Sequence, residues 1–240
     1  MTMEVLMTEG QISAARREMI ERGMSGLESA TRALMRKLRL TSEISVGDEQ
    51  KSWDVLAAIT FLEKHVAKSE PIADIGCFAS EVLISLHKLG YAELTGIDLN
   101  PRLSRMPFRD HIRYEISDFM KTPFAPNSFQ AVTSISVIEH GYNPDRLLAE
   151  MSRLIRPGGY LLTSFDYWPE KIDTSGTTFF GMDWLIFSRA DVESFISKAA
   201  RFGFRPTGRL DFDGRDKVIH CAGKAYTFAM LAMQKTAETA

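Results

Sequence analysis

The chain has 240 residues, enough for one α/β domain with an appendage or for two small domains. Apolar residues make up 45% and charged residues 25%, so a sizeable core can form. The formal net charge is −2 and the pI is about 6.2, which leaves no broad positive surface for nucleic acid. No apolar run is long enough to span a membrane, so we expect no membrane-spanning segment.

The two cysteines, Cys77 and Cys221, are too few for a disulfide framework and show no zinc-like spacing with histidine. We therefore predict no metal site. The early acids Glu4 and Glu9 are untypical of a secretory or transit peptide. Together these features indicate a reducing, cytoplasmic setting.

The region 1–48 is predicted to be a helical extension, because leucines recur at helical spacing along its second half. Gly23 and Gly26 are expected to divide it into two helices. We interpret this extension as a lid over a ligand or as a dimer arm, so a homodimer is one option.

Residues 49–240 alternate between strand and helix patterns, which predicts a doubly wound, mainly parallel, Rossmann-like α/β sheet. The last two strands have no helix between them and predict a C-terminal antiparallel hairpin. The predicted helices are Trp53–His65, Ser80–Leu89, Asp145–Ile155 and a capped helix from Ser188 to Phe202. The predicted strands are Ile72–Ile75, Glu93–Asp98, Ile112–Ile116, Ala131–Ser136, Tyr160–Phe165, Arg209–Phe212 and Tyr226–Met233.

The first strand-to-helix turn holds the strongest candidate binding residues. Asp74 lies near the strand end, where its carboxylate can help hold a cationic amino group. Gly76 follows, and the absence of a Cβ there lets the backbone approach a ligand closely. Ligands of doubly wound sheets bind beyond the carboxyl ends of the strands, so this turn predicts a binding site. A generic tight turn is the alternative.

The next two strands also end in acids. Asp98 follows Gly76 by about 20 residues, the spacing at which a carboxylate can accept hydrogen bonds from both ribose hydroxyls. Asp118 follows the third strand and can accept from the exocyclic amine of adenine, with a neighbouring apolar side chain against the ring. Solvated strand-end carboxylates are the alternative for each acid taken alone.

Taken in order, these motifs resemble class I methyltransferases that depend on S-adenosylmethionine (SAM), of the group that methylates small molecules. The run Leu154–Leu161, with its Arg-Pro-Gly-Gly centre, resembles the family segment that leads into the fifth strand. The resemblance covers about residues 50–235 and implies SAM as the cofactor. The cofactor-binding residues that it implies are Asp74, Gly76, Cys77, Phe78, Asp98, Leu99, Asp118, Phe119 and Ser136.

One departure stands in the first turn, where the family has its second and third glycines. Phe78 and Ser80 occupy those positions. Because phenylalanine does not readily adopt positive φ, the turn must run at negative φ there or be strained. In one interpretation Phe78 packs against the methionine tail of the cofactor or walls off the site. In the other, SAM binding is weakened or lost, which leaves a methyltransferase-like fold with another role.

Candidate catalytic residues follow the fourth and fifth strands. His140 can act as a base near neutral pH, and Tyr142 can line an acceptor pocket, although a Glu-His pair here also serves the family as scaffold. Asp166 opens an aromatic segment, about residues 166–187, that suits a ring-shaped acceptor or a sugar face. A lid with its own small core is the alternative interpretation of that segment.

The predicted function is SAM-dependent methyl transfer to an oxygen or nitrogen of a small metabolite, such as a sugar or a natural-product intermediate. Small-molecule acceptors are favoured over nucleic acid by the charge balance. Three alternatives remain open. They are a non-catalytic, methyltransferase-like binding or regulatory protein, an RNA methyltransferase, and a nucleotide-dependent oxidoreductase.

Overall fold

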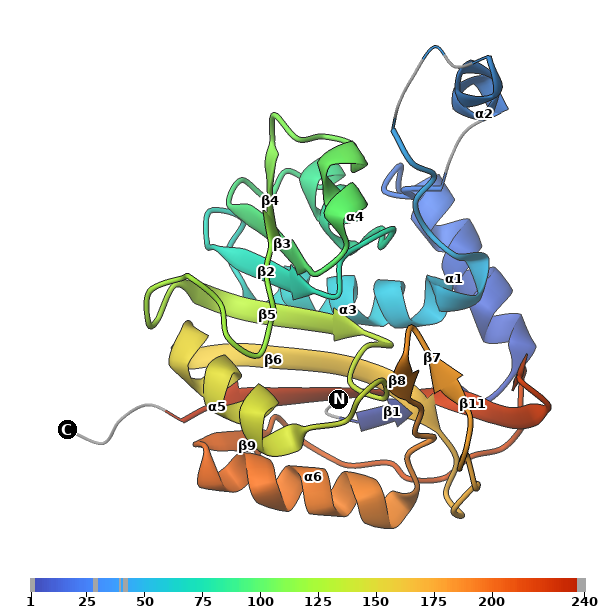
Figure 1. Cartoon of the computed structure of the whole chain (residues 1–240), viewed down its shortest axis with the longest axis vertical. Helices are drawn as coiled ribbons and strands as arrows, with labels where there is room; N and C mark the ends of the chain where they lie inside the picture. The colour runs from blue at the N-terminus through green and yellow to red at the C-terminus, as the bar shows by residue number, and fades with distance from the viewer. Residues whose placement is uncertain (1–2, 28–29, 39, 41–42, 237–240) are drawn as a thin grey trace.

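The computed structural model describes residues 3–27, 30–38, 40 and 43–236. A nine-stranded sheet runs through the molecule in the order β1-β11-β6-β5-β2-β3-β4, with β9 and β10 also paired to β11 (Figure 1). The strands are β1 Met3–Val5, β2 Ile72–Ile75, β3 Leu94–Asp98, β4 Ile112–Ile116, β5 Phe129–Ile135, β6 Ile155–Tyr167, β9 Phe204–Pro206, β10 Ile219–Cys221 and β11 Lys224–Lys235. A separate two-stranded hairpin consists of β7 Thr178–Phe179 and β8 Met182–Asp183.

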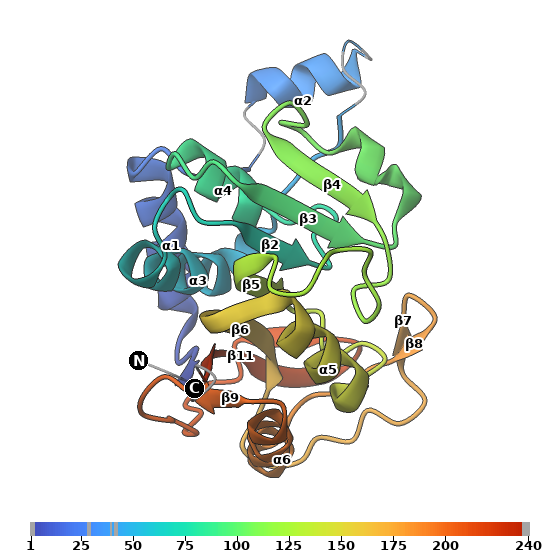
Figure 2. The same ribbon diagram turned by 90° about the vertical axis from the view of Figure 1, so that its left-hand side faces the viewer.

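The helices form a layer on each side of this sheet (Figure 2). On one side lie α1, α3 and α4, and on the other lie α5 and α6; α2 stands outside both layers. The helices are α1 Glu9–Glu21, α2 Ala30–Lys37, α3 Ser52–His65, α4 Val82–Lys88, α5 Pro144–Leu154 and α6 Arg189–Arg201, with short 3-10 turns η1 Glu49–Lys51 and η2 Pro101–Arg105. None of the described helices is long and apolar enough to cross a membrane.

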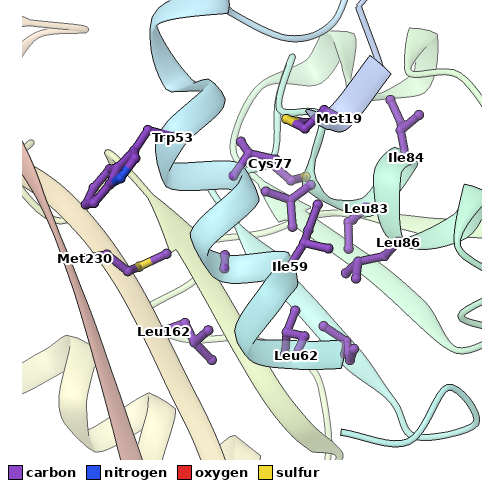
Figure 3. Packing of buried hydrophobic residues seen from close by; sticks show 14 of the residues in the cluster. Met19, Trp53, Ile59, Leu62, Cys77, Leu83, Ile84, Leu86, Leu162 and Met230 are labelled. Carbon is purple, nitrogen blue, oxygen red and sulfur yellow. The ribbon is translucent and has the colours of Figure 1, made fainter. Parts of the chain in front are cut away.

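The predicted parallel sheet is confirmed, because β2 pairs parallel with β3 and β5, β3 with β4, and β5 with β6. The prediction of a helix over Trp53–His65 is also confirmed. This helix turns Ile59 and Leu62 toward the sheet, where Figure 3 shows them packed with Leu162 and Met230. Burial of such apolar side chains contributes about 1.5–3 kcal/mol each.

Three predictions at element level need correction. The Arg-Pro-Gly-Gly run does not separate helix from strand, since β6 begins at Ile155 directly after α5. The predicted strand Arg209–Phe212 is wrong: the segment has only an isolated bridge from Leu210 to Met3. The C-terminal antiparallel hairpin exists, but its first strand is β10. Finally, β1 at the chain start was not predicted, because three residues are too short to show a pattern.

The register of the parallel strands fixes where the site lies. Asp74 is paired with Gly96 on β3, and Asp98 with Ile116 on β4, so the strand-end acids share one edge. Along β6, alternation turns Ser164 and Asp166 toward the α3 side. Phe165 between them joins the core on the α5 and α6 side.

Candidate functional site

The first turn of the site is built on Gly76, whose φ is +68°. Its amide donates to the Ile97 carbonyl at 2.8 Å. A Cβ added at Gly76 would lie 2.3 Å from Cγ2 of Val137, closer than real contacts allow. Both the left-handed backbone and the close approach of the chain after β5 therefore require glycine here.

Phe78 does not adopt positive φ; the next residue, Ala79, does so instead with φ +63°. The amide of Phe78 donates to Oδ2 of Asp98 at 3.0 Å, which ties the turn to the end of β3. Its ring faces the guanidinium of Arg102, 5.6 Å from the ring centroid. The turn therefore runs at negative φ at Phe78, and the strained alternative does not occur at this residue.

Asp98 accepts a second hydrogen bond, from the amide of Asn100 to Oδ1 at 2.8 Å. Each oxygen has one backbone donor and keeps a further lone pair. The neighbouring Leu99 side chain is 62% exposed, so the position beside Asp98 is open to solvent. These features fit the predicted contact with two ribose hydroxyls.

Asp74 is almost completely buried behind this turn. Thr133 donates to its Oδ1 at 2.6 Å, while Oδ2 has no partner among the described residues. Burial raises the pKa of Asp74 to about 7, partly offset by hydrogen bonds from Thr133 and Ser80. An unpaired buried oxygen fits a carboxylate that awaits a cationic partner. Cys77, next along the turn, is buried in the core.

Asp118 lies at the open end of the edge, beyond β4. Its Oδ1 accepts from the amide of Met120 at 2.8 Å, and Oδ2 pairs with Arg146 at 3.1 Å. Phe119 is partly buried against the core on the α5 side. The structure therefore arranges Asp74, Asp98 and Asp118 along one edge, in the order of the predicted cofactor contacts.

Ser136 connects this edge to the rest of the site. It has φ +51°, a conformation that non-glycine residues rarely adopt and that often marks functional positions. Its amide donates to Ser164 Oγ at 3.2 Å, and Ser164 in turn donates to Asp54 Oδ2 at 2.8 Å. The ammonium of Lys51 donates to Ser136 Oγ at 2.5 Å.

Three carboxyl groups lie buried beside Ser136: Asp54 from α3, Glu139 after β5 and Asp166 on β6. Burial raises the pKa of Asp54 to about 6 and that of Glu139 well above its ordinary value. Burial also raises the pKa of Asp166, but Trp184 Nε1 donates to it at 2.7 Å and Tyr226 adds a second hydrogen bond. Both donors favour the charged form of Asp166 and so oppose the effect of burial on its pKa.

His140 lies at the mouth of this group. Burial and the charge of Lys51 lower its pKa to about 4, so the imidazole is neutral at pH 7. Its ring packs edge-on against Phe179 and Phe180 of the β7–β8 hairpin, at 5.8 and 5.5 Å between centroids. Tyr142 lies elsewhere, packed against Phe187 and Phe195 on the α5 and α6 side. His140 and Asp166 are connected through Trp184, which forms a backbone bridge with His140 and donates to Asp166, whereas Tyr142 packs against the other core cluster.

The β7–β8 hairpin is tied to the chain after β5 by backbone hydrogen bonds. Leu185 donates to the Glu139 carbonyl at 2.9 Å, and Gly141 donates to the Asp183 carbonyl at 2.8 Å. At its tip Phe180 is 86% exposed and has φ +56°. The aromatic segment predicted over 166–187 therefore contains a hairpin that is joined to the chain around Glu139 and His140.

The N-terminal region is attached to the first turn by a buried ion pair. Arg16 of α1 and Glu81, just before α4, are 4% and 1% exposed, and Arg16 also donates to Ser52 at 2.9 Å. The Gly26 amide donates to Glu81 at 2.8 Å, and Gly47 to the Ala79 carbonyl at 2.8 Å. These contacts place residues 25–27 and 43–48 against the predicted cofactor turn.

Sequence reasoning missed Lys51 and Asp54 as site residues and did not connect them with Glu139. A signal existed in Asp54, an acid on the otherwise apolar buried face of α3. A second signal was the polar pair Ser164 and Asp166, which share one face of an apolar strand. Trp53, the first residue of the helix predicted over Trp53–His65, lies in the core (Figure 3).

The fold and the strand-end acids define a Rossmann-like methyltransferase domain. Residues 73–163 match the family model described as "Methyltransferase domain", so this part of the chain is a methyltransferase domain. The predicted resemblance to methyltransferases is confirmed for this domain by the family model, and its Rossmann-like fold is confirmed by the solved structures.

Similar proteins extend this comparison. The sterol 24-C-methyltransferase ERG6B of Gibberella zeae is 28% identical over 96 residues, which cover 37% of this chain and 25% of that protein. The [4+2]-cyclase SpnF has a TM-score of 0.61 at 16% identity, covering 80% of this chain and 83% of that one. A geranyl diphosphate methyltransferase in complex with SAM has a TM-score of 0.56 at 18% identity, covering 75% and 85%. The chain spans less than half the length of the curated relatives it matches.

Proposed function

We propose that this protein transfers the methyl group of SAM to an oxygen or nitrogen of a small metabolite. One observation carries the proposal. Two candidate proton acceptors, the imidazole of His140 and the carboxyl group of Asp166, lie after β5 and near the end of β6, at the edge of the sheet that holds the predicted cofactor contacts. An oxygen or nitrogen acceptor loses a proton when it is methylated, and these groups can receive it.

The residues present fit the cofactor. Asp74 offers an unpaired carboxylate oxygen to its amino group, and the turn of Gly76, Cys77 and Phe78 approaches it without a side chain at Gly76. Asp98 with Leu99 would hold the ribose, whereas Asp118 with Phe119 would hold the adenine. When bound, SAM supplies an electrophilic methyl group on a sulfonium. The protein then contributes mainly proximity and orientation.

The acceptor would bind between Ser136, His140 and Asp166, under the β7–β8 hairpin. The aromatic residues of 166–187 support a ring-bearing acceptor, such as a sugar or a natural-product intermediate. In this proposal Tyr142 supports the neighbouring wall through its contact with Phe187. The cytoplasmic setting, a homodimer and the role of 1–48 as a lid or dimer arm remain predictions.

A second candidate is a protein that binds SAM without transferring its methyl group. The structural likeness to a [4+2]-cyclase favours keeping it, because one fold can host unrelated reactions. RNA methylation is less favoured, since the net charge of −2 gives little attraction for phosphate.

Calorimetric titration with SAM and with S-adenosylhomocysteine (SAH) tests the proposal first. We expect binding of both, and an Asp98→Ala variant should bind SAH at least about tenfold more weakly. Transfer from methyl-labelled SAM to a panel of small hydroxyl and amine compounds tests the reaction. Absence of SAH binding would remove the enzyme assignment, while SAH binding without transfer to any compound would favour the non-catalytic candidate.

A further inference from the structure

The ammonium group of Lys51 occupies an unusual position. It lies 3.5 Å from the centroid of the Phe228 ring and donates to Ser136. Phe228 is paired with Asp166 on β6, so this ring lines the same part of the edge as the buried acids. The structure therefore already seats one primary ammonium over an aromatic face, as cation–π recognition requires.

More carboxyl groups surround this ammonium than Lys51 alone can pair with. Asp54, Glu139 and Asp166 all interact electrostatically with Lys51, so three acids face one cation. Glu139 is completely buried, and neither of its carboxyl oxygens has a partner among the described residues. Oδ1 of Asp54 is likewise buried and unpaired. Buried polar groups without partners cost free energy, which a cationic ligand can recover.

Lys51 is not placed there to stabilise its helix. It directly precedes α3, at the end of the helix where backbone amides make the local field positive. A lysine at that position is slightly destabilising for the helix, and its four-carbon side chain can swing outward. The cation at this position in the structure is itself a primary ammonium, so an organic ammonium is the ligand that matches it.

We propose that this group of residues recognises the protonated amino group of the methyl acceptor, whose ammonium takes the position held in this structure by the ammonium of Lys51. The inference rests on the proposed function and narrows it to N-methylation of an amine. Phe228 would pack against the incoming cation, and Asp166 would be its counter-ion. Trp184 and Tyr226 fix the Asp166 carboxylate by their hydrogen bonds.

The same residues complete the chemistry. The bound ammonium passes one proton to the Asp166 carboxylate, which becomes a carboxylic acid, and the amine gains a lone pair. That lone pair forms the new bond between nitrogen and the methyl carbon. The bond between sulfur and the methyl carbon breaks, its electron pair stays on sulfur, and SAH is left. The product is a methylated ammonium, so charge and atoms balance.

Matched ligand pairs test the recognition. The probes are primary amines, each paired with its alcohol, such as 2-phenylethylamine with 2-phenylethanol and cyclohexylamine with cyclohexanol. Short carboxylates of similar size complete the panel. Binding is measured by calorimetry with the protein alone and with saturating SAH. We expect at least one amine to bind about tenfold or more tightly than its alcohol, because only the amine carries the matching charge.

Two variants, each with a matched control, test which side chain produces the preference for amines and which one opposes it. Asp166→Asn should remove the preference for amines, whereas Asp110→Asn, the same change at an exposed position away from the site, should keep it. Lys51→Gln should strengthen amine binding, because the competing ammonium is gone; Lys64→Gln, at an exposed position of α3, should change nothing. Retained SAH affinity verifies that each variant is folded.

Three results would overturn the inference. One is equal binding of amines and alcohols, and another is the absence of any amine binding in a protein that binds SAH. The third is tight binding of the carboxylates that Lys51→Gln abolishes, since Lys51 would then be an anion receptor. Failure of SAH binding would instead remove the proposed function, and it is read separately from the amine titrations made without SAH.

Discussion

At the scale of single residues, the site depends on a few positions where backbone geometry and burial leave little choice. Gly76 combines positive φ with close contact to Val137, and Ala79 and Ser136 adopt positive φ without being glycine. Strained positions of this kind cluster at functional sites, where surrounding structure holds them in place. All three lie at the carboxyl edge of the sheet, which is the location that the cofactor contacts require.

Replacing Gly76 by alanine should reduce both stability and SAH binding. The added methyl group collides with Val137 in addition to the φ strain, so we expect a loss of about 2–4 kcal/mol in the free energy of unfolding. Gly90→Ala is the matched control, since Gly90 has φ +88° but nothing within 4 Å of an added Cβ. It should lose only about 1 kcal/mol. Urea unfolding measures both, and equal losses would contradict the packing argument.

Asp74 should make SAH affinity depend on pH. Its pKa of about 7 means that the carboxyl is protonated below that pH. If the ionised form holds the cofactor amino group, SAH binding weakens as pH falls through 7, by about tenfold between pH 8 and pH 6. Calorimetry across this range measures the effect, with exposed Asp110→Asn as the control. An Asp74→Asn variant should lose the pH dependence, and a persistent one would assign it to another group.

At the scale of elements, the N-terminal segment matters because it reaches the cofactor turn. Arg16 of α1 attaches this segment to the turn by an ion pair with Glu81. It also donates hydrogen bonds to Ser52 and Ser25. A buried pair of this kind contributes little net stability, yet removal of one partner leaves an uncompensated charge. The ion pair therefore joins α1 directly to the segment that follows the turn of Gly76.

Arg16→Met should lower the free energy of unfolding by about 3–5 kcal/mol. The double variant Arg16→Met with Glu81→Gln should recover part of that loss, because the unpaired buried charge is removed. Arg22→Met is the control: its pair with Glu63 is 30% exposed on both sides, so about 1 kcal/mol or less is at stake. Urea unfolding distinguishes these cases; similar losses for Arg16 and Arg22 would refute the anchoring role.

The β7–β8 hairpin is the second element with a testable strain. Phe180 adopts φ +56° at the exposed tip, beside Gly181 with φ +77°. Phe180→Gly should relieve the strain and raise the free energy of unfolding by about 0.5–1 kcal/mol. It should also weaken acceptor binding, since the ring beside His140 is lost. Phe180→Ala separates the two effects, because it removes the ring and keeps the strain; a stability gain in that variant would speak against this account.

At the scale of the whole molecule, the sheet brings buried acids together from distant parts of the chain. Asp54, Glu139 and Asp166 lie on a helix, a loop and a strand, and they meet because α3 crosses the sheet where β5 and β6 end. Folding therefore places acidic groups in a region that disfavours their charged forms. Stability should decline as pH rises through the range in which they ionise.

The variant Asp54→Asn should reveal how much of this pH dependence of stability comes from Asp54. The pKa of Asp54 is raised from 3.8 to about 6, so its ionisation opposes folding as pH rises from 4 to above 6. Relative to the unchanged protein, the variant should gain up to about 3 kcal/mol over that interval. Unfolding by urea at several pH values measures the gain, with Asp110→Asn as an exposed control. If the difference in free energy of unfolding between the variant and the unchanged protein did not vary with pH, burial would not disfavour the ionised form of Asp54.

The sequence alone was enough to predict the parallel strands β2 to β6, the helices α3 to α6, and the edge where Asp74, Gly76, Asp98 and Asp118 lie. The hydrophobic period of a helix or strand and the residue preferences of turns depend on neighbouring residues, so the sequence alone predicts these features. Local pattern also located the N-terminus of α6, through its capping box at Ser188.

Only the tertiary structure decided which side chains face one another across that edge. Lys51, Asp54, Glu139 and Asp166 are separated by up to 115 positions, and no local pattern relates them. Their proximity depends on the register of β5, β6 and β11 and on how α3 packs over them. The same reason explains the missed strand β1, which is held by pairing to β11 at the opposite end of the sequence.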